Sequence, residues 1–217
     1  RANEYTELKN KMEVYGKTFS NYGIDINKIP VFIETSMYDG TPETLNDPPL
    51  PYQSESQQAV GMLKTYAFGT AHGIDKIFWN YVVERSPEPT GKKEIFSWYG
   101  LVHNPQNDGL PHKKLSYYSF KKMIEMLEGS DWGGIRIIQE KDEVYIYKLS
   151  KQGKPVWVVW NDNPQEKQIT IQGVTSPRVR ITDAVPKYES GKEVMAYSTA
   201  FKTEIKTAND GVITLIL

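Results

Sequence analysis

The first half of the chain alternates between helical and extended hydrophobic patterns. Apolar residues recurring every three to four positions predict three helices, over 3–22, 54–73 and 116–127. The second begins with Ser-Glu-Ser-Gln, in which Ser54 and Gln57 match a capping box. Apolar runs predict strands over 31–33 and 75–81, the first of them buried on both faces. This order, α-β-α-β-α, is typical of a parallel α/β arrangement.

The second half of the chain alternates apolar and polar residues by twos. The alternation is clearest over 144–149 and 156–160. About seven or eight short strands separated by turns predict an antiparallel β-sandwich. The pattern changes at GSDWGG, residues 129–134. We therefore expect one domain over 1–130 and a β-sandwich domain over 131–217.

Composition and charge narrow the classes of function. The 217 residues have a net charge of −1 and a pI near 6.4, which gives no electrostatic reason to expect nucleic acid or a membrane surface as partner. No apolar run approaches the roughly 20 residues of a membrane-spanning helix. The chain begins with Arg1 rather than Met, so we expect any targeting segment to lie upstream.

The residue composition argues against a metal site and is rich in aromatic side chains. Cysteine is absent, which excludes disulfides and thiolate ligands. His103 and His112 are too sparse on their loop for a metal site, and we expect no metal or cofactor. The 14 Tyr and 5 Trp combine apolar faces with hydrogen-bonding edges. Sugar-binding clefts need such residues, and large sandwiches also use them in their cores.

Glu34 is the candidate catalytic residue of this chain. It ends the apolar run 30–33, at the point where that strand leaves the core. In a barrel of parallel strands, active sites are assembled at this rim. The alternative is a strand-end glutamate that is solvated or paired with a lysine.

Three motifs in order suggest a family. They are IETS at 33–36, AHGIDKIFW at 71–79, and GLV at 100–102 followed by KLSYYSFK at 114–121. Their order and spacing resemble the last part of a retaining glycoside hydrolase of the large clan built on (β/α)8 barrels. In that clan a nucleophilic glutamate ends the seventh strand, and several families append a β-sandwich. The resemblance implies a partial TIM-barrel segment followed by an antiparallel β-sandwich.

The same resemblance implies a mechanism. Glu34 would be the nucleophile of a double displacement on an oligo- or polysaccharide. The clan's acid/base glutamate ends the fourth strand, which lies outside this chain, so we expect the isolated chain to be incomplete and inactive. The missing N-terminal part of the barrel would come from the same polypeptide, a partner fragment or a second copy. The competing interpretation is a non-catalytic carbohydrate-binding or structural module.

Five further residues are candidates for substrate binding: Trp79, Tyr38, Asn80, Glu84 and Trp98. Trp79 would form the floor of the sugar site beside Glu34, or else fill the core. Tyr38 would donate a hydrogen bond to the Glu34 carboxylate, or else pack within its loop. Asn80 and Glu84 would bind sugar hydroxyls, or else lie solvated. Trp98 would be an outer sugar platform.

Overall fold

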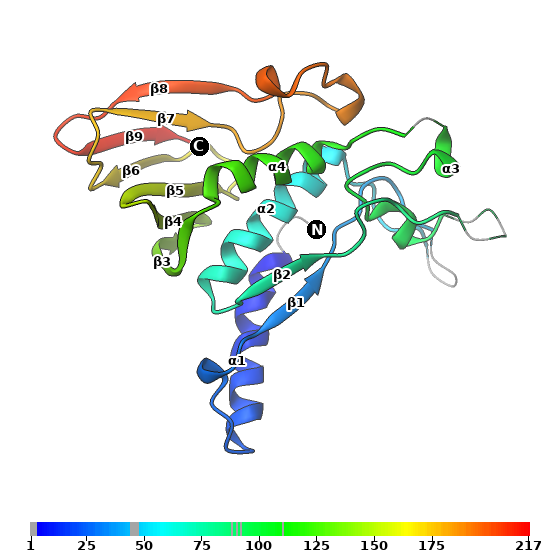
Figure 1. The fold of residues 1–217 in the computed structure, drawn as a ribbon, viewed down its shortest axis with the longest axis horizontal. Helices are drawn as coiled ribbons and strands as arrows, with labels where there is room; N and C mark the ends of the chain where they lie inside the picture. Colours follow the sequence, from blue (N-terminus) through cyan, green and yellow to red (C-terminus); the bar gives the residue numbers. More distant parts are fainter. Residues whose placement is uncertain (1–3, 44–47, 88, 90, 92, 110) are drawn as a thin grey trace. The chain divides into compact units, whose positions relative to one another are not determined.

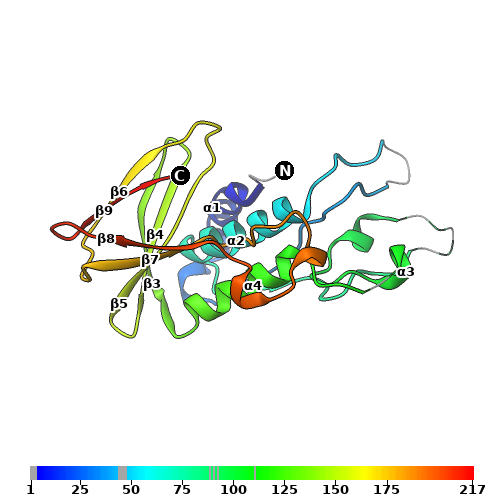
Figure 2. The ribbon, with the colours of Figure 1, turned by 90° about the horizontal axis from the view of Figure 1, so that it is seen from above.

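A computed structural model describes residues 4–43, 48–87, 89, 91, 93–109 and 111–217 (Figures 1 and 2). The chain forms two compact units. The first comprises Arg1–Met123 and Ala184–Phe201, and the second comprises Ile124–Asp183 and Lys202–Leu217. The structure differs from the expected domain boundary mainly at Ala184–Phe201, because this segment returns from the second half of the sequence to the first unit.

The first unit contains helices and one pair of strands. Its elements are η1 (Glu4–Thr6), α1 (Glu7–Ser20), η2 (Ile26–Lys28), β1 (Phe32–Thr35), α2 (Glu55–Ala71), β2 (Lys76–Trp79), η3 (Ile95–Trp98), α3 (Pro105–Asp108), the start of α4 (Leu115–Leu127), η4 (Gly191–Glu193) and η5 (Tyr197–Thr199). The predicted capping box is confirmed: Ser54 Oγ accepts from the Gln57 amide, and Gln57 Oε1 accepts from the Ser54 amide.

Strands β1 and β2 are parallel neighbours joined through α2 (Figure 1). Glu34 pairs with Phe78, and Thr35 pairs with Trp79. Helix α2 covers one face, since a Cβ added at Gly69 would touch Ile77. On the other face, the side chains of both strands are exposed within the described part of the chain.

The prediction that the first strand is buried on both faces is wrong. Side chains along β1 and β2 alternate between exposed and half-buried, and the exposed fractions of Phe32 and Phe78 are 52% and 53%. Parallel sheets in soluble proteins have both faces covered. The open face of this pair carries Phe32, Glu34, Lys76 and Phe78, and no second layer covers it among the residues that the structure describes.

The second unit is built from antiparallel sheets. Its strands are β3 (Ser130–Lys141), β4 (Val144–Lys151), β5 (Lys154–Asn161), β6 (Gln168–Gln172), β7 (Arg178–Thr182), β8 (Thr203–Thr207) and β9 (Val212–Ile216). They pair as β3-β4-β5, β6-β9 and β7-β8. One core joins β4, β6 and β9, with Trp157 of β5 packed against it. Trp160 lies on the opposite face of β5, stacked on Tyr145.

The described residues form a mixed arrangement of helices, one parallel strand pair and antiparallel sheets, with no closed barrel among them. None of the helices in the described ranges is long and apolar enough to cross a membrane.

Candidate functional site

Glu34 lies near the carboxyl end of β1, and its side chain is exposed. Within the described residues, its carboxylate makes no hydrogen bond or ion pair. Its pairing with Phe78 places it on the open face of the strand pair. The carboxylate is therefore free to meet a group that approaches this face.

Trp79 does not adjoin Glu34 as expected. It pairs with Thr35, so strand alternation directs its side chain to the face opposite Glu34. Its indole N–H donates to the Tyr99 carbonyl at 3.2 Å. The floor of a sugar site beside Glu34 is thus not formed by Trp79, which instead anchors the loop that contains Tyr99.

Asn80 and Tyr81 follow the end of β2. The Asn80 amide donates to the Thr35 carbonyl at 2.8 Å and so extends the ladder by one residue. Continued alternation puts Asn80 on the face of Phe78 and Glu34. Tyr81 has a φ of 65°, which is strained for a residue with a side chain. A backbone conformation of this kind costs about 1–3 kcal/mol and is found most often at functional sites.

Tyr38 and Trp98 prove to be loop-packing residues. The Tyr38 hydroxyl donates to the Pro51 carbonyl at 3.0 Å, and the residue is buried. It therefore supports its own loop rather than Glu34. The Trp98 ring lies against Gly40, where a Cβ would overlap it, and Lys93 Nζ lies 5.5 Å from its centroid. Trp98 is thus half-buried and packs against the loop that contains Gly40.

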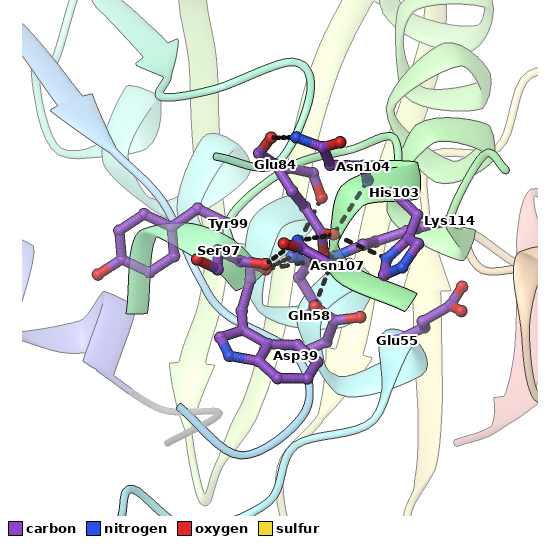
Figure 3. Close-up of polar contacts among 12 residues, drawn as sticks. Asp39, Glu55, Gln58, Glu84, Ser97, Tyr99, His103, Asn104, Asn107 and Lys114 are labelled. Carbon is purple, nitrogen blue, oxygen red and sulfur yellow. Dashed lines mark hydrogen bonds and ion pairs between the residues drawn. The ribbon is translucent and has the colours of Figure 1, made fainter. Parts of the chain in front are cut away.

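Glu84 is not solvated, because its side chain is buried among polar partners. Its carboxylate is fully buried and ion-paired to Lys114. On its other oxygen it accepts from His103 Nδ1 at 2.7 Å, from the Asn104 amide at 3.1 Å and from Asn107 Nδ2 at 2.9 Å (Figure 3). Glu84 is thus the centre of a buried polar network.

Lys114 extends this network to the loop after β1. Its ammonium group, with 1% of the side chain exposed, lies 2.5 Å from Asp39 Oδ1 and donates to the Trp98 carbonyl (Figure 3). Gln58 of α2 adds a second link, because its amide donates to the carbonyls of Met37 and Trp98. The loops that follow β1 and β2 are therefore held together by buried polar groups.

Glu55 organises the neighbouring part of the network. Its carboxylate accepts from the Leu115 amide, the Ser190 hydroxyl and the Gly191 amide, at 2.7–2.8 Å. His112 Nε2 lies 3.7 Å from it, and the rings of His112 and His103 are 4.7 Å apart. Through Glu55, the segment Ala184–Phe201 is bound to the first unit.

The two buried acids that contact Lys114 differ in protonation. For Asp39, burial outweighs the attraction of Lys114 and raises the pKa to about 6. For Glu84, burial acts in the same direction, but hydrogen bonds from His103 and the charge of Lys114 prevail and lower the pKa to about 2. Glu84 therefore stays ionised in mildly acidic solution, where Asp39 takes up a proton.

A pocket of about 700 Å³ lies at the opposite ends of the strands. Its lining includes Met12 of α1, Ile29, His72 and Asp75, and it does not include Glu34. Across the described part of the chain, no group of three or more His, Asp or Glu is arranged to hold a metal ion.

Sequence reasoning missed most of the buried network. Asp39 and Lys114 are 75 residues apart, and both lie at the edges of loops without periodicity. Asp39 and Glu84 share one signal: each lies shortly after a strand that enters a long loop. For Glu84 this position predicts a side chain that binds sugar hydroxyls or lies solvated, whereas the structure buries it; for Asp39 the sequence predicts no role.

No family model matches the chain, and no curated protein and no solved structure is significantly similar to it.

Proposed function

We propose that the first unit is the C-terminal part of a (β/α)8 retaining glycoside hydrolase, with Glu34 as the nucleophile. The observation that supports this most is the placement of Glu34: an exposed carboxylate near the carboxyl end of a parallel strand, on the same open face as Phe32 and Phe78. Nucleophiles of barrel enzymes occupy such positions, and the motif order agrees.

Exposed aromatic rings on the open face support the proposal that the missing part of the barrel packs against this face. Phe32 and Phe78 contact each other at a centroid distance of 6.2 Å, yet about half of each side chain is exposed. Further apolar strands would cover these rings and surround Glu34 with a cleft. In this proposal the remaining part of the barrel supplies those strands, together with the acid/base carboxyl group.

The catalytic step needs only two carboxyl groups, about 5–5.5 Å apart. Glu34 would attack the anomeric carbon while the partner acid protonates the departing oxygen; water would then release the sugar with net retention. Asn80, on the same face by alternation, is the substrate-binding candidate that the geometry favours.

The test is hydrolysis of a panel of aryl glycosides by the polypeptide at its full native length. We expect activity that is lost in Glu34→Gln and kept in Glu128→Gln, an exposed control. In Glu34→Ala, azide should restore turnover and yield a glycosyl azide of inverted configuration, because the small anion replaces the missing nucleophile.

Two results would contradict the proposal. One is hydrolysis that survives Glu34→Gln. The other is saturable binding of a polysaccharide to the native-length polypeptide without hydrolysis of any glycoside, which would favour the non-catalytic module.

A further inference from the structure

Strand β1 pairs along one edge only. On that edge the Thr35 carbonyl accepts from the Asn80 amide at 2.8 Å, and the Val31 carbonyl accepts from the first residue of β2 at 3.3 Å. Successive residues of a parallel strand direct their backbone groups to alternate edges, so those of Phe32 and Glu34 point away from β2. No strand of the described ranges lies along this second edge. It is therefore an unpaired edge of the kind on which another strand can form.

The unpaired edge belongs to the same two residues that β1 contributes to the open face. The Phe32 ring is 52% exposed, and Lys76 Nζ lies 5.1 Å from its centroid. Glu34 lies two residues further along β1 and pairs with Phe78. A strand on this edge would lie about 4.8 Å away and would direct alternate side chains to the open face. It would therefore cover one side of the Phe32 ring and place a side chain beside the Glu34 carboxylate.

Helices α1 and α2 lie on one face of the strand pair. The rings of Tyr5, just before α1, and Phe68 of α2 have centroids 5.2 Å apart. A Cβ added at Gly69 of α2 would touch both Leu8 of α1 and Ile77 of β2. Because parallel strands joined through a helix cross over right-handed in about 98% of cases, steps through helices on one face all advance in the same direction. A strand that leads into α1 therefore lies on the unpaired side of β1, as β2 lies on the other.

We propose that a strand preceding α1 in the same polypeptide pairs in parallel with β1, through the backbone groups of Phe32 and Glu34, and forms one wall of the cleft at Glu34. The inference rests on the proposed barrel and names the neighbour of the proposed nucleophile, but it does not depend on glycosidase chemistry. A second copy of the chain is the competing occupant of this edge. Two-fold symmetry would pair the two copies of β1 antiparallel, so the direction of pairing distinguishes the two occupants.

The test is NMR spectroscopy of the polypeptide at its full native length, with amide exchange measured for the four residues of β1. The amides of Ile33 and Thr35 face β2 and serve as internal references, because they are paired whether or not a further strand is present. We expect the amides of Phe32 and Glu34 to be protected to within about tenfold of these references. We also expect nuclear Overhauser effects from these two amides to α protons of residues that precede this sequence, in the order of a parallel pair.

Exchange at Phe32 and Glu34 that is more than about tenfold faster than at the references would show an open edge and overturn the inference. Protection without the expected Overhauser effects would overturn it too, as would contacts to any other segment, or antiparallel contacts to a second copy in a sample that mixes labelled and unlabelled chains. Hydrolysis that needs Glu34 in a protein whose β1 edge is open would refute the strand alone. A paired edge without hydrolysis of any glycoside would refute the glycosidase alone.

Discussion

Replacing Glu84 with glutamine removes the central charge of the buried network. The pKa of Glu84 falls from 4.5 to about 2 on folding, which corresponds to about 3 kcal/mol of stability at neutral pH. Breaking a buried ion pair by removing one partner costs about 3–5 kcal/mol, because the other charge stays buried. We therefore expect Glu84→Gln to lower the free energy of unfolding of the first unit by at least about 3 kcal/mol at pH 7.

The pH dependence gives a second test of the same variant. Because the folded pKa lies below the unfolded value, the contribution of Glu84 is complete above pH 4.5 and is lost as the pH falls towards 2. Wild type and Glu84→Gln should therefore converge in stability on acidification. An effect due to altered packing alone would persist at low pH.

Urea unfolding read by hydrogen exchange of α2 peptides reports on the first unit separately. Glu34→Gln is the matched control, because the same change at an exposed glutamate should alter stability by less than about 0.5 kcal/mol. A difference between Glu84→Gln and wild type of under about 1 kcal/mol at pH 7 would refute the stabilising role of the Glu84 charge. A difference that stays constant down to pH 3 would refute it as well.

Two further substitutions test contacts elsewhere. Gly191→Ala should detach the segment Ala184–Phe201, because a Cβ at this position would overlap the Lys113 carbonyl oxygen. Limited proteolysis should then cut this segment faster than in wild type. Equal rates of cleavage would contradict the close approach of Gly191 to Lys113. Tyr147→Phe should destabilise the second unit by about 1.5–3 kcal/mol, because the buried hydroxyl donates a hydrogen bond to Glu140 at 2.6 Å. An unchanged midpoint of urea unfolding would show that this hydrogen bond contributes nothing to stability. The matched controls are Gly133→Ala and Tyr22→Phe.

Local sequence determined the helices and strands because their signals act over a few residues. The capping box at Ser54 and the apolar periodicity behind it place the start of α2 within one residue of the expected position. The alternation in the second half predicts strands such as β4 and β5, which do pair antiparallel. These patterns depend on backbone hydrogen bonding and side-chain direction, both of which repeat with a short period.

Tertiary structure decided which polar residues are buried together. Glu84 and Tyr38 sit in loops where polarity predicts exposure, but partners from distant segments satisfy their hydrogen bonds and allow burial. Glu55 illustrates the same limit, since it binds Ser190 across 135 residues and draws a late segment into the first unit. No periodic pattern encodes such contacts, because they arise from the meeting of loops rather than from regular backbone geometry. The sequence alone thus specified the elements and the position of Glu34 near a strand end, while packing alone set the partners of Asp39, Glu84 and Lys114.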